Sequence, residues 1–235
     1  MNDHMRNQIL LKLIHSPEAR FSDIWDKKIE SNVFTYHLKK LETEGLVEKK
    51  DELYSLTDKG RQESAFIEGT TGDKAMMVVP VVVIIVIDEK KVLVQRRLKE
   101  PFYGYHGFIS GKINFGFNAV ECAARDLLEE TDLSADLELK GISMTKTFND
   151  GKLAFHHFFF TVLGKNHRGK LKYETHKEEN FWVSLDDTSK LENKFPDFDY
   201  VLDLVQGDKF FIREVDRIQE NSVFKESVVR SERFL

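Results

Sequence analysis

Three acidic side chains, Asp126, Glu129 and Glu130, are spaced so that they could act on one ligand. Residues separated by three and four positions lie on the same face of an α-helix, one turn apart. Because like charges this close repel, the pattern favours a bound cation. Helical carboxylates suit Mg²⁺ or Mn²⁺, which also take phosphate oxygens from a substrate. The preceding turn, Ser-Gly-Lys at 110–112, contains a glycine that lets the backbone approach a ligand.

The stretch from Gly111 to Leu133, GKINFGFNAVECAARDLLEETDL, resembles the Nudix box, whose pattern is G-x5-E-x7-R-E-U-x-E-E-x-G-U with U apolar. The positions that match, without gaps, are Gly111, Arg125, Leu127, Glu129, Glu130 and Leu133. Three positions depart from the pattern. Phe117 replaces the first Glu, Asp126 replaces the Glu after the Arg, and Asp132 replaces the Gly that closes the helix.

Segments on both sides of the box, at 92–97, 106–108 and 178–183, also resemble the family, so the resemblance covers roughly residues 76–206. It implies the Nudix fold, an α/β structure in which a mixed sheet lies between helices as an α/β/α sandwich. It also implies residue roles. The implied catalytic residues are Arg125, Asp126, Glu129 and Glu130, and the implied metal ligands are Gly111, Asp126, Glu129, Glu130 and, as an added ligand or base, Glu179.

The departures bear on activity. Asp126 keeps the charge of the expected Glu but withdraws the carboxylate by about 1.5 Å. A misplacement of about 1 Å can lower a rate on the order of 100-fold. Phe117 removes an acid altogether. We therefore expect weakened chemistry, with binding of Mg²⁺ or Mn²⁺ and of a diphosphate retained.

Three further residues are candidates for binding the ligand. Arg96 and Lys112 could neutralise a diphosphate, and Arg96 is favoured because its planar guanidinium suits phosphate oxygens. Phe148 could stack on a nucleobase, since aromatic faces accept any base, or could fill the core.

The first seventy residues carry an independent signal. Apolar residues recur at helical spacing within 5–15, a short helix is expected near 21–25, and a longer helix begins at Ser31 and stops before Gly45. Short strands at 46–48 and 53–56 follow, and then another helix. This layout, and the segment FTYHLKKLE followed by Gly-Leu-Val, resemble the winged helix-turn-helix domain of bacterial and archaeal repressors.

The resemblance implies a recognition helix in the major groove and a wing on the DNA backbone. The candidate DNA-binding residues are Ser31, Asn32, Thr35, Tyr36, Lys39 and Lys40 on the helix, and Lys49 and Lys50 at the wing tip. Residues 1–70 hold 11 Lys and Arg against 13 Asp and Glu, a net charge of −2. Charge alone therefore does not indicate DNA, and a protein-binding winged helix is the alternative.

Composition narrows the class of protein. Charged residues make up 32% of the 235 residues and the net charge is −5, which fits a cytoplasmic chain without general affinity for polyanions. The single cysteine, Cys122, excludes an internal disulfide framework. The apolar run at 76–87 is too short to span a membrane and predicts a buried strand, and no secretory signal begins the chain.

Small and polar residues at 68–73 indicate a boundary. We predict a winged helix-turn-helix domain at 1–70, a Nudix domain at 71–207 and an extension at 208–235. The extension could add strands, dock on the helical domain or pair with a second chain. Within the Nudix domain, the expected strands are 78–87, 91–97, 138–148, 153–162 and 182–184, and the expected helices are 118–131, 185–190 and 198–205.

Two functions fit these observations. The favoured hypothesis is a homodimeric transcription regulator that binds operator DNA and responds to a nucleoside-diphosphate-linked metabolite, because a sensor need not turn over its ligand. The alternative is a Mg²⁺-dependent hydrolase that cleaves the pyrophosphate of a nucleoside diphosphate linked to another group.

Overall fold

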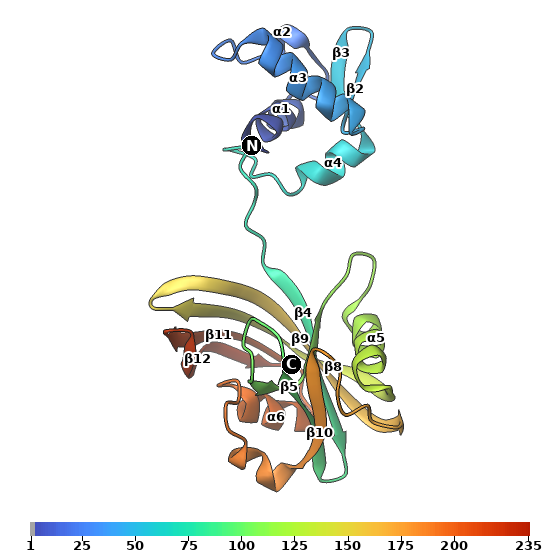
Figure 1. Ribbon diagram of the computed structural model, residues 1–235, viewed down its shortest axis with the longest axis vertical. Coiled ribbons are helices and arrows are strands. Elements are labelled where there is room, and N and C mark those ends of the chain that lie inside the picture. The colour runs from blue at the N-terminus through green and yellow to red at the C-terminus, as the bar shows by residue number, and fades with distance from the viewer. Residues whose placement is uncertain (1–2) are drawn as a thin grey trace. The chain divides into compact units, whose positions relative to one another are not determined.

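The computed structural model describes residues 3–235 and divides the chain into two compact units, Met1–Met77 and Val78–Leu235 (Figure 1). Each unit has its own hydrophobic core. In the described part of the chain, none of the helices has the length and apolar character needed to cross a bilayer.

The first unit combines short helices with a small sheet. Its helices are α1 (Asp3–His15), α2 (Phe21–Ile24), α3 (Ser31–Thr43) and α4 (Asp58–Ser64). Its strands, β1 (Ala19–Arg20), β2 (Val47–Lys50) and β3 (Leu53–Leu56), lie in the order β1-β3-β2. The buried face of α3 carries Phe34, Leu38 and Leu41, which occur at helical spacing and join the core. Glu30, not Ser31, occupies the position before the first turn of α3.

The second unit is built on one large mixed sheet. Its strands are β4 (Val79–Asp88), β5 (Lys91–Arg97), β6 (His106–Gly107), β7 (Ile109–Lys112), β8 (Leu133–Asn149), β9 (Lys152–Gly169), β10 (Glu178–Ser184), β11 (Phe211–Glu220) and β12 (Val223–Phe234). The main order is β10-β5-β4-β9-β8-β11-β12, with β6 beside β5 and β7 beside β4. Two pairs are parallel, β4 with β9 and β8 with β11.

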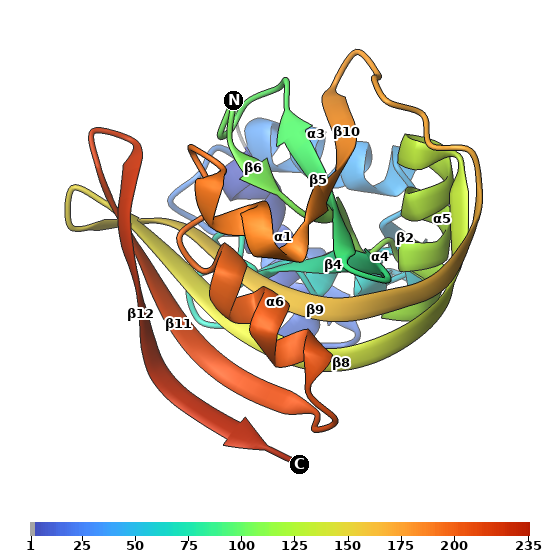
Figure 2. The same cartoon turned by 90° about the horizontal axis from the view of Figure 1, so that it is seen from below.

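Helices cover both faces of this sheet. Figure 2 shows α5 (Ala119–Thr131) and α6 (Phe198–Gln206) on opposite sides, and a 3₁₀ helix, η1 (Leu185–Lys190), precedes α6. Alternate residues of β4 serve the two layers, because successive side chains of a strand point to opposite faces. Val82, Ile84 and Val86 pack in the core that includes α5, whereas Ile85 packs in the core that includes α6. The unit is therefore an α/β/α sandwich.

Residues 208–235 belong to the sheet. They form the hairpin of β11 and β12, and β11 runs parallel to β8 with Phe211 opposite Gly141. The Phe211 ring is fully buried in the α6 core. A Cβ atom at Gly141 would lie 2.5 Å from that ring, so a glycine is needed where the hairpin docks. Of the three placements that the sequence leaves open for this segment, the structure shows added strands.

We expect the docked hairpin to be part of the stability of the second unit. Phe211→Ala should lower its free energy of unfolding by about 3–5 kcal/mol, because a fully buried aromatic side chain is lost and a cavity remains. Ile212→Ala, at the next residue and 43% exposed, should cost less than about 1 kcal/mol. Urea unfolding followed by the fluorescence of Trp182, in a Trp25→Phe background, isolates this unit. Equal effects of the two substitutions would contradict the packing.

Candidate functional site

The second unit contains a pocket of about 490 Å³. Its basic lining residues are Arg97, Lys99, Lys112, Arg125, Arg213 and Arg217. Its acidic lining residues are Asp126, Glu130 and Asp197, and its aromatic lining residues are Phe102, Phe108, Phe159, Phe195 and Phe198. Cations therefore outnumber anions two to one around a partly aromatic space. This composition suits a ligand that is negatively charged at one part and apolar or aromatic at another.

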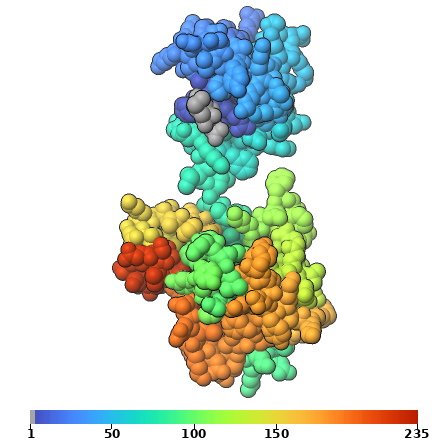
Figure 3. Space-filling model, in the orientation of Figure 1, coloured from blue at the N-terminus to red at the C-terminus, as the bar shows by residue number. Residues whose placement is uncertain are grey.

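Aromatic side chains beside this pocket contact one another across three segments of the chain. The Phe102 ring lies 5.5 Å from Phe195 and 5.2 Å from Phe224, which belongs to β12. Tyr105 contacts the same two rings, and its hydroxyl accepts a hydrogen bond from the Phe224 backbone N–H. Figure 3 shows the green segment around residue 100 beside the red C-terminal hairpin at the surface. The hairpin and the loop after β5 therefore form one wall.

Asp126 lies on α5 at the inner edge of the pocket and is 6% exposed. Its Oδ1 accepts hydrogen bonds from Nε and Nη2 of Arg125, at 2.9 and 2.7 Å. Among the described residues, its buried Oδ2 has no hydrogen-bond partner. A Cβ atom at Gly111 would lie 1.8 Å from this Oδ2, so β7 and α5 can approach this closely only with glycine there.

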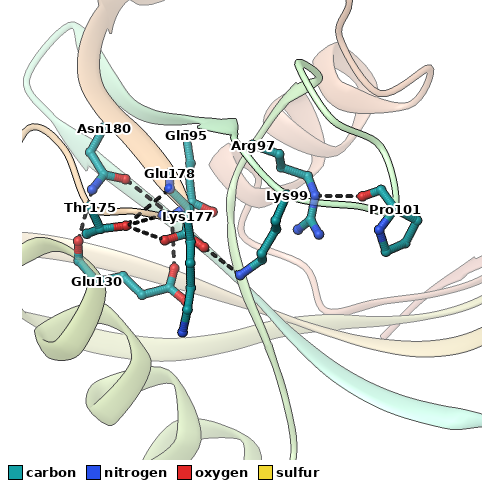
Figure 4. Close-up of polar contacts among 9 residues, drawn as sticks. All are labelled: Gln95, Arg97, Lys99, Pro101, Glu130, Thr175, Lys177, Glu178 and Asn180. Atoms are coloured by element: carbon teal, nitrogen blue, oxygen red, sulfur yellow. Dashed lines mark hydrogen bonds and ion pairs between the residues drawn. The ribbon is translucent and has the colours of Figure 1, made fainter.

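Glu130 takes part in a polar network that links α5 to β5 and β10 (Figure 4). Its Oε2 accepts a hydrogen bond from Gln95 Nε2 at 2.8 Å. Asn180 joins both elements, because its Oδ1 accepts from Gln95 at 3.2 Å and its Nδ2 donates to the Glu130 carbonyl at 2.9 Å. Oε1 of the buried Glu178 accepts a hydrogen bond from Lys99 Nζ at 2.5 Å. Burial raises the pKa of Glu130, and the nearby Glu178 charge adds to the increase, whereas the Gln95 hydrogen bond opposes it.

The three departures from the Nudix pattern each have a local structural setting. Phe117 is half exposed and its ring lies 5.7 Å from the Arg125 guanidinium, a cation–π distance. Asp132 ends α5 with φ of 57°, the left-handed conformation in which glycine is usual and Asp is tolerated. Asp126 is the shortened acid that bonds to Arg125. These replacements are thus accommodated by the fold.

The predicted ligand-binding residues do not all meet in the pocket. Lys112 lines it, but Arg96 and Phe148 do not. Arg96 instead donates to Glu179 at 3.0 Å, and its neighbour Arg97 lines the pocket because alternate residues of β5 face opposite sides. The lining residues that sequence reasoning missed include Arg97, Lys99, Arg213 and Arg217. Alternation along β5 is a signal that could have pointed to Arg97.

The predicted DNA-binding residues lie on one face of α3 and on the β2–β3 hairpin. Ser31, Asn32, Tyr36, Lys39 and Lys40 are exposed, with Tyr36 at 64%. Thr35 is half-buried and its hydroxyl donates to the Ser31 carbonyl at 2.7 Å. The two hairpin lysines form local ion pairs, Lys49 with Glu52 at 2.9 Å and Lys50 with Glu48 at 3.0 Å.

Comparison with known proteins identifies the second unit. The family model of the NUDIX domain matches residues 77–204, more than half of the chain. The chain therefore belongs to the Nudix family, and its α/β/α sandwich with a mixed sheet is the Nudix fold.

Several solved structures are similar to this chain at low sequence identity. The MutT mutator protein of Bacillus halodurans is 21% identical, with a TM-score of 0.55, and the match covers 67% of this chain and 97% of that one. The NUDIX domain of Shewanella oneidensis NrtR, solved with ADP ribose, is 16% identical, with a TM-score of 0.47 and coverage of 64% and 97%. A MutT NUDIX hydrolase of Burkholderia pseudomallei is 18% identical, with a TM-score of 0.42 and coverage of 47% and 86%. No curated protein sequence matches the chain.

Nudix hydrolases generally use divalent metal ions, and such an ion needs several ligand atoms close together. Glu129 is exposed, Glu130 bonds to Gln95, and Glu179 is paired with Arg96. Across residues 3–235, no three acidic, histidine or cysteine side chains are grouped closely enough to hold a metal ion. The unpartnered Asp126 Oδ2 offers only one oxygen to a metal ion. The residues therefore do not fit a preformed metal centre.

The raised pKa of Glu130 has a consequence for stability. The folded protein binds this proton more tightly than the unfolded chain, so the stability that Glu130 contributes is complete below the unfolded pKa of 4.5 and is lost as pH rises through the folded pKa. At pH 7 the unfolded chain is ionised at this position whereas burial disfavours the charge in the folded protein, so the raised pKa costs stability and Glu130→Gln should raise Tm.

Thermal unfolding at several pH values checks this. The advantage of Glu130→Gln should shrink as pH falls and should be absent below about 4.5, because the carboxyl is then neutral in both states. Glu129→Gln, at the exposed neighbouring position, should change Tm little at any pH. A lower Tm for Glu130→Gln than for the parent at pH 7 would contradict the view that this buried carboxylate destabilises the fold.

Proposed function

We propose that the protein is a ligand-responsive transcription regulator. Its first unit binds operator DNA as a winged helix, and the pocket of its Nudix unit binds a nucleoside-diphosphate-linked metabolite. The observation that carries the proposal is that two acids of the degenerate box, Asp126 and Glu130, and Glu179 on β10 are hydrogen-bonded within the fold, beside a pocket rich in cations. Asp126 is bonded to Arg125, Glu130 to Gln95 and Glu179 to Arg96.

The pocket has the size and chemistry for such a ligand. Its volume of about 490 Å³ falls within the usual range for small-molecule sites, roughly 300–1,000 Å³. Lys112, Arg97 and Lys99 bring positive charge that suits a diphosphate. Phe102 and Phe195 offer aromatic surface on which a base or sugar could lie. Binding without turnover needs only these groups, not an intact catalytic centre.

The first unit has the element order of a winged helix. Three helices precede the β2–β3 hairpin, and α3 buries one face while it exposes Asn32, Tyr36 and Lys39 on the other. These residues lie four and three positions apart and so share a face of the helix. Because residues 1–70 carry a net charge of −2, affinity for DNA has to come from this local surface. Such a protein would act in the cytoplasm.

Regulation requires that the ligand favour one state of the protein over another. A ligand with equal affinity for two arrangements of the DNA-binding units shifts neither. We propose a homodimer whose two winged helices read two half-sites, so that the ligand changes operator affinity through their placement.

The DNA-binding part is testable with selected DNA. The full chain should retain specific sequences from a randomised duplex pool at low salt, and Tyr36→Ala and Lys39→Ala should each weaken that binding. Removing one phosphate contact at Lys39 should also lower the slope of log affinity against log salt by about 1. Lys170→Ala, an exposed lysine of the Nudix unit, is the matched control and should leave both quantities unchanged.

The result that rejects a DNA-binding regulator is plain. Either the pool yields no retarded duplex with the parent chain, or Lys170→Ala weakens binding as much as Lys39→Ala. In the first case the protein-binding winged helix becomes the better interpretation of the first unit.

A second candidate is a hydrolase requiring Mg²⁺ or Mn²⁺ that cleaves the pyrophosphate of a nucleoside diphosphate linked to another group. It is favoured by one observation, that Asp126 and Glu130 line the cationic pocket and Asp126 Oδ2 has no partner among the described residues. On this candidate the parent releases phosphate groups in the presence of Mg²⁺, and Glu130→Gln abolishes the release.

Restoring the family pattern discriminates between the two candidates. If the parent is a sensor, the double substitution Phe117→Glu with Asp126→Glu should raise Mg²⁺-dependent turnover of nucleoside-diphosphate sugars, on the order of 100-fold for a repositioned carboxylate. Phosphate release is measured with the parent and the Glu130→Gln form as references. Rapid turnover by the parent, lost in Glu130→Gln and not improved by the double substitution, would favour the hydrolase.

A further inference from the structure

Two arginines of the C-terminal hairpin share one aspartate in the wall of the pocket. Arg213 and Arg217 are four residues apart on β11, so both point to the same face of the sheet. Arg213 Nη2 donates to Asp197 Oδ2 and Arg217 Nη2 donates to Asp197 Oδ1, each at 2.7 Å. Arg213 Nε also donates to Ser143 Oγ at 2.9 Å.

Arg213, Arg217 and Asp197 together carry one more positive charge than negative charge, and two guanidinium donors are left without an acceptor among the described residues. Within residues 3–235, Arg213 Nη1 and Arg217 Nε are buried without a hydrogen-bond partner. Arg213 is only 1% exposed, so water does not freely satisfy its donor. A buried guanidinium N–H without an acceptor costs free energy, and the cost is larger for a charged group than for a neutral one. The pocket side of the cluster therefore lacks an anionic acceptor.

One further acid borders the cluster, on the Arg213 side. Glu232 of β12 lies opposite Arg213, its Oε2 accepts a hydrogen bond from the Tyr200 hydroxyl at 2.6 Å, and its Oε1 is buried without a partner among the described residues. In the same part of the chain, Arg217 Nε remains without an acceptor.

The Arg217 guanidinium lies 5.1 Å from the Phe159 ring and 5.4 Å from the Phe195 ring, so its flanks are aromatic. Burial lowers the pKa of the neighbouring His157 to about 4, with a further contribution from the Arg217 charge. His157 is therefore neutral at pH 7. The remaining acids among the described lining residues, Asp126 and Glu130, belong to α5.

We propose that Arg213 and Arg217 form a subsite for one oxyanion, a carboxylate or a phosphate, carried by the ligand of this pocket. The subsite is supplied by the C-terminal hairpin and not by the box. It rests on the proposed ligand-binding role of the pocket, and it narrows the metabolite to one whose group beyond the diphosphate bears its own negative charge. Asp197 orients both guanidinium groups and neutralises part of their charge, and the unpartnered donors suit a single anion.

The test uses the full chain and two simple probes, inorganic phosphate and acetate. The Nε–H signals of ¹⁵N-labelled arginines are followed by NMR during each titration. The Arg217 Nε–H signal should shift and saturate, because this donor gains an acceptor. The signal of Arg168, which pairs with Asp136 at the surface, should show only a small, linear change. A response to phosphate alone or to acetate alone assigns the anion as phosphate or carboxylate.

Variants separate binding from a purely structural role. Arg217→Gln should weaken binding of the responding anion about 10-fold or more, whereas Arg168→Gln should leave it unchanged. Arg217→Lys keeps the charge without the planar fork and should recover part of the affinity. The parent titration stands by itself if a variant fails to fold.

The proposal is overturned if neither anion shifts the Arg217 signal with saturation, or if anion binding is the same in parent and Arg217→Gln. The cluster would then serve only to anchor the hairpin. Because the assay contains neither DNA nor nucleotide, its outcome is independent of the regulator proposal. Nucleotide binding is measured separately. Saturable anion binding in the NMR titration, with no nucleotide binding in that separate measurement, would uphold the subsite and reject the metabolite proposed for the pocket.

Discussion

The buried carboxylate of Asp197 accepts hydrogen bonds from both Arg213 and Arg217, and so attaches the C-terminal hairpin to the rest of the second unit. Removing one partner from a buried ion pair typically costs about 3–5 kcal/mol, because the other charge is left uncompensated. Loss of this aspartate would leave two guanidinium groups in the wall together. The interaction joins the residue before α6 to β11. Because β11 pairs in parallel with β8, its two arginines lie in the pocket wall. The charge of the pocket therefore depends on the C-terminal hairpin as much as on the box.

The box keeps its structural role while two of its acids, Asp126 and Glu130, are hydrogen-bonded to neighbouring side chains. Gly111 still permits the close approach of β7 to α5, and Asp126 fills the space that a Cβ atom would otherwise take. Phe117 packs near the guanidinium of Arg125 where the family pattern has an acid. These contacts make the helix a scaffold for the pocket wall. We propose that this arrangement, in which Asp126 and Glu130 are hydrogen-bonded beside a cationic pocket, suits a protein that holds a ligand without consuming it.

Much of the second unit was predictable because its signals are local. The box predicted helix 118–131, observed at Ala119–Thr131, and the strands expected at 138–148 and 153–162 placed the junction of β8 and β9. Strands β8 and β9 extend beyond their predicted bounds. The extra length was not predicted because register shifts near Ser134 and Leu139 interrupt the apolar alternation. Added strands at 208–235 were only one of three open possibilities, because the buried face of β11 carries arginines as well as apolar residues and such a face has no apolar period. Pairing of Arg213 with an acid far along the chain is not a local signal.

We propose that the Nudix unit binds an anionic, nucleoside-diphosphate-linked ligand and releases it intact. Thermal unfolding of the full chain with a panel of nucleoside-diphosphate sugars, followed by chromatographic recovery of each compound, tests it most directly. The account predicts that at least one compound raises Tm in a concentration-dependent way and is recovered uncleaved after incubation with Mg²⁺. It is contradicted if no compound raises Tm, or if the compound that does is cleaved with multiple turnovers.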